Sequence, residues 1–172
     1  EQLAIITSSK DEGLIVVDIN TGTTVSIFKN CLCDSSCACI ISSDLSFSGR
    51  GLAGDYIAIS QSKKPVIHIY QWNKSQPHMV CHIQEITTAL TSDSSGTYIY
   101  GGTKGGRIHC WELSTGNLLQ SWQAHFKTVT RIGVTCCGMY LMSCSEDGMV
   151  RVWLTASIIG GHSVIGGGSP AP

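Results

Sequence analysis

Apolar and polar residues alternate with a period of two through most of the chain. In the segment Val150-Arg-Val-Trp153, for example, the two valines share one face and the arginine lies on the other. Successive side chains of a β-strand point to opposite faces, so this alternation predicts strands. We find no amphipathic helical pattern of useful length, and the alternation therefore predicts an all-β chain.

Fourteen strands are expected, in four consecutive groups. The first group is Leu3–Ser8, Leu14–Ile19 and Thr24–Lys29. The second is Cys37–Ser43, Tyr56–Ser60, Val66–Trp72 and His78–Ile83. The third is Ile86–Ser92, Tyr98–Gly102, Arg107–Glu112 and Leu118–Gln123, and the fourth is Thr128–Thr135, Tyr140–Ser145 and Met149–Leu154.

The groups repeat at a regular spacing. Trp111 lies 42 residues before Trp153, Tyr70 lies 41 residues before Trp111, and Val17 takes the same place in the first group after a longer gap. A period of about 42 residues with four strands per repeat is typical of a β-propeller blade. We predict blades at about 1–30, 31–83, 84–123 and 124–155, followed by a Gly/Ser/Pro-rich flexible tail at 156–172.

The fourth group lacks an outer strand, so we expect an incomplete propeller, with about three and a half blades of a seven-bladed ring. Closure of the ring removes exposed strand edges. With 42% hydrophobic and only 13% charged residues, an open arc would be prone to association. The sequence therefore favours a fragment or truncated product of a protein about twice as long. On its own, this chain is expected to aggregate, to dimerise through its open strand edge or to be only partly ordered.

Four residues of the last repeat have a characteristic spacing. His125, Ser143 and Asp147 precede Trp153 by 28, 10 and 6 residues, and this arrangement resembles a WD-repeat blade. The resemblance implies a structural tetrad in which Asp147 bonds the imidazole, which bonds the serine hydroxyl and so reaches the indole N–H. A buried polar network of this kind is stable when every member is paired. The earlier repeats are degenerate, because Gly105 and Lys64 stand where the aspartate belongs.

Composition narrows the possible functions. The net charge is −1, and Lys63-Lys64 is the only adjacent pair of bases, so the sequence provides no global basic field for nucleic acid. No apolar stretch is long enough for a membrane span. Nine cysteines in a strand-rich chain favour a reducing, intracellular setting.

Candidate chemical sites are few. Cys31, Cys33, Cys37 and Cys39 are weak candidates for a zinc site, since structural sites prefer pairs separated by two to four residues; the alternative is that they are small apolar fillers. The glycines at 101–106 lead into a strand rather than a helix, so they do not form a phosphate loop. His68 and His109 are expected on outward strand faces. We expect no enzyme activity, metal or cofactor.

Two longer segments, residues 54–72 and 105–130, resemble the WD-repeat subunits of the rixosome. The first carries Lys64-Pro65, His68 and Trp72, and the second carries Trp111-Glu-Leu-Ser-Thr-Gly116. The resemblance, to the amino-terminal half of such a subunit, implies a non-catalytic nuclear scaffold in rRNA processing and large ribosomal subunit maturation. It implies helical-repeat protein partners and indirect association with pre-ribosomes, in the nucleolus or nucleoplasm.

The alternative is a generic WD-repeat adaptor such as a ubiquitin-ligase substrate receptor. Such receptors often show Trp-Asp-x-Arg after the third strand, whereas the corresponding segments here, Trp153-Leu-Thr-Ala156 and Trp111-Glu-Leu-Ser114, contain no arginine. In either case partners are expected on the loops between blades and the turns between the second and third strands. The candidate contact residues there are Phe126, Thr128, Glu146, Lys104 and Lys63.

Overall fold

The computed structural model describes residues 3–8, 13–29, 37–42, 55–61, 64–71, 74 and 76–160. Within these ranges it contains fourteen strands in four antiparallel sheets. The first sheet is β1 (Leu3–Ser8), β2 (Gly13–Asp18) and β3 (Thr24–Lys29). The second is β4 (Ala38–Ser42), β5 (Asp55–Ser60), β6 (Val66–Gln71) and β7 (Pro77–His82). The third is β8 (Thr87–Ser92), β9 (Tyr98–Thr103), β10 (Arg107–Glu112) and β11 (Leu118–Gln123), and the fourth is β12 (Val129–Val134), β13 (Tyr140–Ser145) and β14 (Val150–Leu154).

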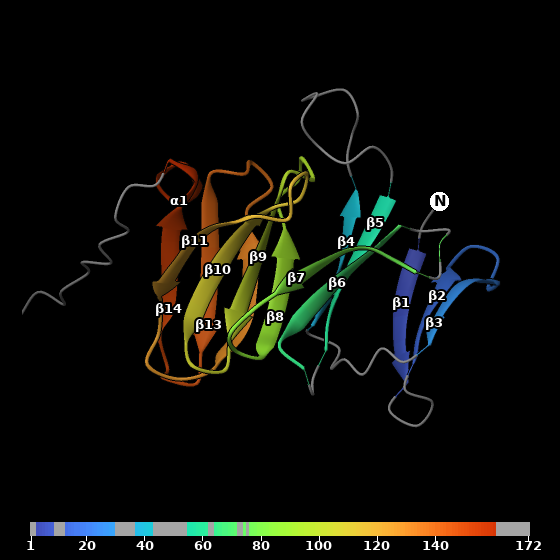
Figure 1. The fold of residues 1–172 in the computed structure, drawn as a ribbon, viewed down its shortest axis with the longest axis horizontal. Helices are drawn as coiled ribbons and strands as arrows, with labels where there is room; N and C mark the ends of the chain where they lie inside the picture. The colour runs from blue at the N-terminus through green and yellow to red at the C-terminus, as the bar shows by residue number, and fades with distance from the viewer. Residues whose placement is uncertain are drawn as a thin grey trace, which may run out of the picture.

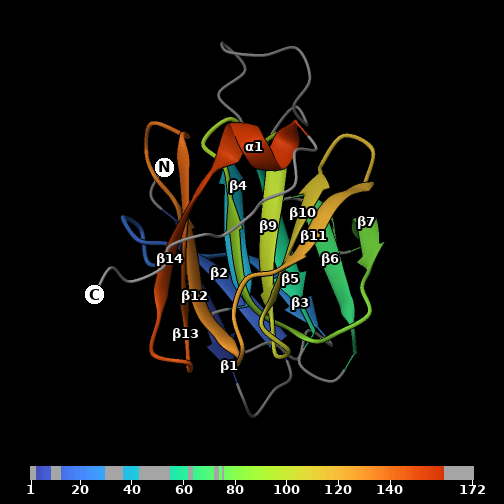
Figure 2. The same ribbon diagram turned by 90° about the vertical axis from the view of Figure 1, so that its left-hand side faces the viewer.

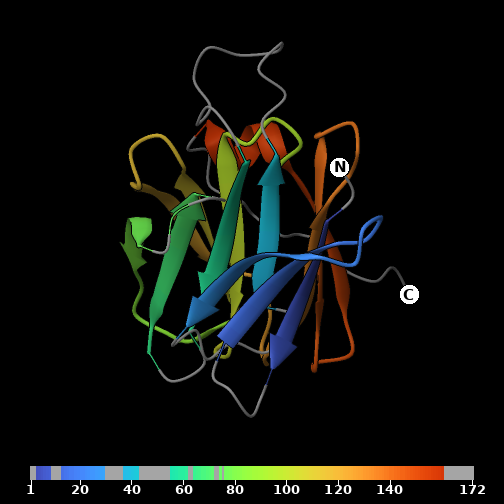
Figure 3. The same cartoon turned by 90° about the vertical axis from the view of Figure 1, so that its right-hand side faces the viewer.

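The predicted fold class is confirmed: the chain is all-β and its sheets stack side by side like the blades of an incomplete propeller (Figure 1). Every predicted strand is present, and its ends differ from the prediction by no more than one residue. Figure 2 shows this stack from the side of the fourth sheet, and Figure 3 shows it from the side of the first.

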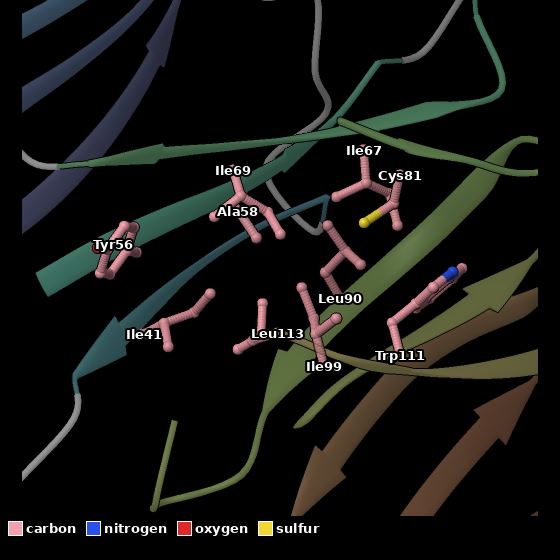
Figure 4. Close-up of a cluster of buried hydrophobic side chains, with 10 residues drawn as sticks. All are labelled: Ile41, Tyr56, Ala58, Ile67, Ile69, Cys81, Leu90, Ile99, Trp111 and Leu113. Carbon is pink, nitrogen blue, oxygen red and sulfur yellow. The ribbon is translucent and has the colours of Figure 1, made fainter. Parts of the chain in front are cut away.

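Each pair of neighbouring sheets encloses a hydrophobic core. Leu14, Val16 and Phe28 meet Ile57, Ile59 and Tyr70 between the first two sheets. The cluster in Figure 4 lies between the second and third sheets, where Ile67, Ile69 and Cys81 face Leu90, Ile99 and Trp111. The third cluster joins Tyr100, Ile108 and Trp122 to Leu141 and Trp153 of the last sheet. Burial of apolar surface therefore holds the blades together.

This packing corrects the expectation for His109, which is only 5% exposed rather than on an outward face. The third sheet is covered on both sides, so neither face of β10 reaches solvent along its centre. The His109 ring packs against Trp111, with ring centroids 5.4 Å apart. The equivalent His68 is half-buried, and its Nδ1 lies 3.1 Å from the Tyr70 hydroxyl.

A short helix, α1 (Thr155–Ile159), begins where the sequence predicted a flexible tail. Ile158 is buried in the core between the third and fourth sheets. The Thr155 hydroxyl donates to the carbonyl oxygens of Gly138 and Met139. These contacts order the residues that directly follow β14, and residues 161–172 lie outside the described part of the chain.

Loops and turns gather at the two ends of the sheets. The β5–β6, β9–β10 and β13–β14 turns and the β7–β8 and β11–β12 loops lie at one end, here called the lower end from its place in Figure 1. The β2–β3, β8–β9, β10–β11 and β12–β13 turns lie at the other, upper end together with α1. All the predicted tetrad and contact residues that the structure describes belong to the third and fourth sheets and the loops beside them.

Candidate interaction site around His125 and Phe126

A continuous hydrogen-bonded chain links the β11–β12 loop to the fourth sheet. His125 Nδ1 lies 3.1 Å from Asp147 Oδ2, and His125 Nε2 lies 2.8 Å from Ser143 Oγ. The Trp153 indole N–H donates to the same Ser143 oxygen at 3.1 Å. The Asp147 carboxylate can only accept, so it favours the tautomer with the proton on Nδ1, in which Nε2 accepts the serine hydroxyl. Because each polar group has a partner, the arrangement stabilises the fold.

Asp147 also anchors the surrounding backbone. Its carboxylate accepts the N–H groups of Phe126 at 3.1 Å and Met149 at 2.9 Å. Burial raises the pKa of this carboxyl, but hydrogen bonds from Met149 and Phe126 and the interaction with His125 outweigh that effect and hold the pKa at about 2. The charged carboxylate therefore connects the β13–β14 turn to the start of the loop that carries Phe126.

This depressed pKa predicts an acid-dependent stability. A carboxyl whose pKa is lower in the folded state stabilises the fold above its unfolded pKa of 3.8, and the stabilisation is lost as pH falls through about 2. We expect the melting temperature of the Asp147→Asn variant to lie below that of the unmodified chain at neutral pH, with a gap that narrows between pH 4 and pH 2. Thermal unfolding followed by circular dichroism would measure both melting temperatures. A difference that stays constant from pH 4 to pH 2 would contradict the stabilising role of the Asp147 carboxylate.

In the third sheet, a hydrogen bond between Glu85 and Thr103 takes the place of the His125, Asp147 and Ser143 network. Gly101 and Gly105 occupy the places of Ser143 and Asp147, and a Cβ on Gly105 would lie 2.5 Å from Glu85 Oε2. That carboxylate instead accepts the Thr103 hydroxyl at 2.8 Å. Glu85 lies on a neighbouring loop, outside the spacing of the repeat, and the missing side chain at Gly105 is the one signal for it in the sequence.

Phe126 is the most exposed large apolar side chain of the lower end, with 84% of its surface accessible. The guanidinium carbon of Arg151 lies 5.9 Å from its ring centroid, within range of a cation–π contact. Arg151 could not be predicted from the sequence, because its contact with Phe126 depends on how the β11–β12 loop lies against β14.

The other predicted contact residues have different positions. Lys104 and Glu146 are exposed at the lower end, Thr128 is half-buried there, and Lys63 lies outside the described residues. The Glu146 N–H donates to the Thr128 carbonyl at 3.0 Å, so the β13–β14 turn and the β11–β12 loop are joined. The structure thus brings these residues, apart from Lys63, to one end of two adjacent sheets.

Only two of the four candidate metal-binding cysteines, Cys37 and Cys39, lie in the described part of the chain. Cys31 and Cys33 lie outside the described residues. Cys37 is buried and its thiol donates to the Thr87 carbonyl, while burial raises the pKa of Cys39 to about 12. The described part of the chain contains no group of three or more His, Cys, Asp or Glu residues placed to hold a metal. Cys37 is buried, and Cys39 is partly buried against the core between the second and third sheets.

The sequence model of the family "WD domain, G-beta repeat" matches residues 116–153. This stretch contains β11 of the third sheet and then β12, β13 and β14 through Trp153, so the sequence repeat is offset from the structural blade. It also contains the four hydrogen-bonded residues described above. Among the described residues the only helix is α1, which is far too short to cross a membrane.

Several curated proteins are similar to the chain. "Protein ROOT INITIATION DEFECTIVE 3" of Arabidopsis thaliana is 31% identical over 153 residues, covering 89% of this chain and 33% of that protein. "Pre-rRNA-processing protein IPI3" of Yarrowia lipolytica is 30% identical over 153 residues, covering 89% of this chain and 34% of its own length. "Pre-rRNA-processing protein pro-1" of Caenorhabditis elegans is 26% identical over 167 residues, covering 92% of this chain and 29% of that protein.

These similarities confirm the resemblance predicted from residues 54–72 and 105–130. The chain spans about a third of the length of the curated relatives it matches. The chain contains one match to the WD-repeat family, at residues 116–153, and along most of its length it is similar to one part of longer proteins named for pre-rRNA processing.

Proposed function

We propose that this chain is part of a non-catalytic interaction scaffold in pre-rRNA processing. The names of its relatives in two fungi and a nematode support this role. The WD repeat supports a scaffold, because propellers present their loops on a rigid frame. We further propose a nuclear or nucleolar site of action, in a complex that matures the large ribosomal subunit. Its partners would be helical-repeat subunits, with pre-ribosomes contacted indirectly.

The observation that carries this proposal is the exposure of Phe126 on an ordered loop. Its backbone N–H is bound by Asp147, and the neighbouring His125 N–H donates to the Gly106 carbonyl at 2.8 Å. The Ser145 hydroxyl donates to the Lys127 carbonyl at 3.1 Å on the other side. A partner would therefore order little backbone on binding, which lowers the entropic cost of association. Exposed aromatic residues dominate the energetics of many interfaces.

Removing the Phe126 side chain should weaken partner binding without unfolding the protein. For Phe126→Ala we expect a loss of about 1 kcal/mol or more in association, roughly fivefold or more in Kd, and an unchanged melting temperature. Affinity capture of the tagged chain from nuclear extract, followed by quantitative mass spectrometry, would measure recovery of pre-rRNA-processing factors.

The matched control is Met139→Ala, which removes a 55% exposed side chain from the upper end. We expect this variant to retain the same partners as the unmodified chain. Equal recovery of these factors with the Phe126→Ala chain would contradict a role for the lower end. Recovery of cullin-ligase adaptors in place of ribosome-biogenesis factors would contradict the proposed process.

A further inference from the structure

Charged residues are unevenly distributed between the two ends of the sheets. The described lower end exposes Lys64, Lys104 and Lys127, with the acidic side chain of Glu146 among them. The described upper end carries the acids Asp18, Asp93 and Glu112 and the single base Lys74. A chain with a net charge of −1 thus separates its charges, and the lower end is locally cationic.

The remaining acids of the lower end are already engaged. Asp147 accepts bonds from His125 and two backbone N–H groups, and Glu85 accepts the Thr103 hydroxyl. Arg151, in contrast, lies beside the exposed ring of Phe126. The described groups of the lower end that remain available to a ligand are therefore mainly cations, and one of them, Arg151, lies beside the protruding Phe126 ring.

An exposed aromatic ring with cations at the same end of the sheets fits a ligand that carries both an apolar side chain and carboxylates. An apolar side chain of a ligand would cover the Phe126 ring, and carboxylates beside it would meet Arg151 and the lysines. Guanidinium groups bind carboxylates in a paired geometry, which adds specificity to the charge attraction. Complementary charges also increase the rate of encounter and select against basic partners.

We propose that the lower end binds an acidic peptide segment, with an apolar side chain on Phe126 and carboxylates on Lys104, Lys127 and Arg151. The inference rests on the proposed scaffold function and names the chemistry of the partner. Single-stranded RNA also combines negative charge with flat rings, and proteins that bind it use cationic grooves and several stacking aromatics. Phe126 is the one large aromatic side chain that the described lower end exposes, and the chain has a net charge of −1; both observations favour the peptide.

Fluorescence anisotropy with the full chain can test this chemistry directly. The probe is a fluorescein-labelled peptide with a central leucine flanked by glutamates, and the control probe has glutamines in place of the glutamates. We expect the glutamate peptide to bind at least about fivefold more tightly than the glutamine peptide, and its affinity to fall as salt increases. The Phe126→Ala and Lys104→Glu variants should each weaken binding of the glutamate peptide by about fivefold or more.

The charge-reversal control is Lys74→Glu, which makes the same change at the upper end. We expect it to alter the affinity by less than about twofold, since charges beyond roughly 10 Å are screened at moderate salt. An equal loss with Lys74→Glu and Lys104→Glu would overturn the proposal, because binding would then follow net charge. Equal affinity for the glutamate and glutamine peptides would also overturn it, as would displacement of the peptide by a more tightly bound oligouridylate.

These outcomes are separable from the test of the scaffold function. If Phe126→Ala loses its pre-rRNA-processing partners but the acidic peptide does not bind, the surface is correct and its proposed chemistry is wrong. If the peptide binds as expected and partner recovery is unaffected by Phe126→Ala, the acidic-peptide site stands and the proposed role of this end in pre-rRNA processing is wrong.

Discussion

Replacing Trp153 with alanine is expected to lower the free energy of unfolding by about 3–5 kcal/mol. The Trp153 side chain is 5% exposed and lies in the core between the third and fourth sheets. Its ring meets Trp122 edge-on, with centroids 5.7 Å apart and planes at 69°. Deleting the indole leaves a cavity between two sheets and also removes the donor to Ser143. Urea unfolding followed by circular dichroism would measure the loss.

The Trp153→Phe variant separates packing from hydrogen bonding. Phenylalanine keeps an aromatic ring in the core but has no N–H for the Ser143 oxygen. We expect Trp153→Phe to cost about 1–3 kcal/mol, between the unmodified chain and Trp153→Ala. If Trp153→Phe and the unmodified chain were equally stable, the hydrogen-bonded network would contribute nothing measurable and the fourth sheet would depend on packing alone.

The strands were predictable because their signal is local. In β12, β13 and β14 the alternation of apolar and polar residues fixes the strand and its faces, and glycines such as Gly138 and Gly148 mark the turns. The hydrogen-bonding partners of His125 could be expected from the spacing of a known repeat. The same information gave the fold class and the position of nearly every strand end.

The sequence signal failed where neighbouring sheets decide the outcome. His109 was expected on an outward face, because alternation within one strand does not show that both faces of its sheet are covered. Glu85 replaces a missing aspartate from a different loop, which no spacing within the repeat could indicate. The contact of Arg151 with Phe126 also depends on the folded loop. Tertiary packing overrides local patterns at each of these positions.

The conformation of the β9–β10 turn also could not be predicted from the spacing of the repeat. Gly105 is the position that matches Asp147, but the left-handed conformation is at Gly106, with φ of 85°. Gly105 instead leaves room for the Glu85 carboxylate. The matching glycine of the last sheet is Gly148, with φ of 80°, so the two turns have nearly the same geometry. This pair allows a controlled experiment.

We expect Gly106→Ala to destabilise the chain by about 3–5 kcal/mol, placing it among the most damaging single substitutions. A Cβ at Gly106 would lie 2.2 Å from the His125 carbonyl oxygen and 2.8 Å from that of Lys127, so the β11–β12 loop would have to move. The Gly106 carbonyl also accepts the His125 N–H, and this contact would be disturbed as well. Thermal and urea unfolding would measure the effect.

Gly148→Ala is the matched control, since a Cβ there would meet nothing within 4 Å. It carries only the cost of placing alanine in the left-handed region, about 1–2 kcal/mol. The difference between the two variants therefore measures how tightly the third sheet supports the loop that bears Phe126. Because the loop must shift in Gly106→Ala, that variant should also lose affinity for the acidic peptide, whereas Gly148→Ala should lose less. Equal destabilisation by the two substitutions would mean that the loop yields freely and that Phe126 is not held in place by the third sheet.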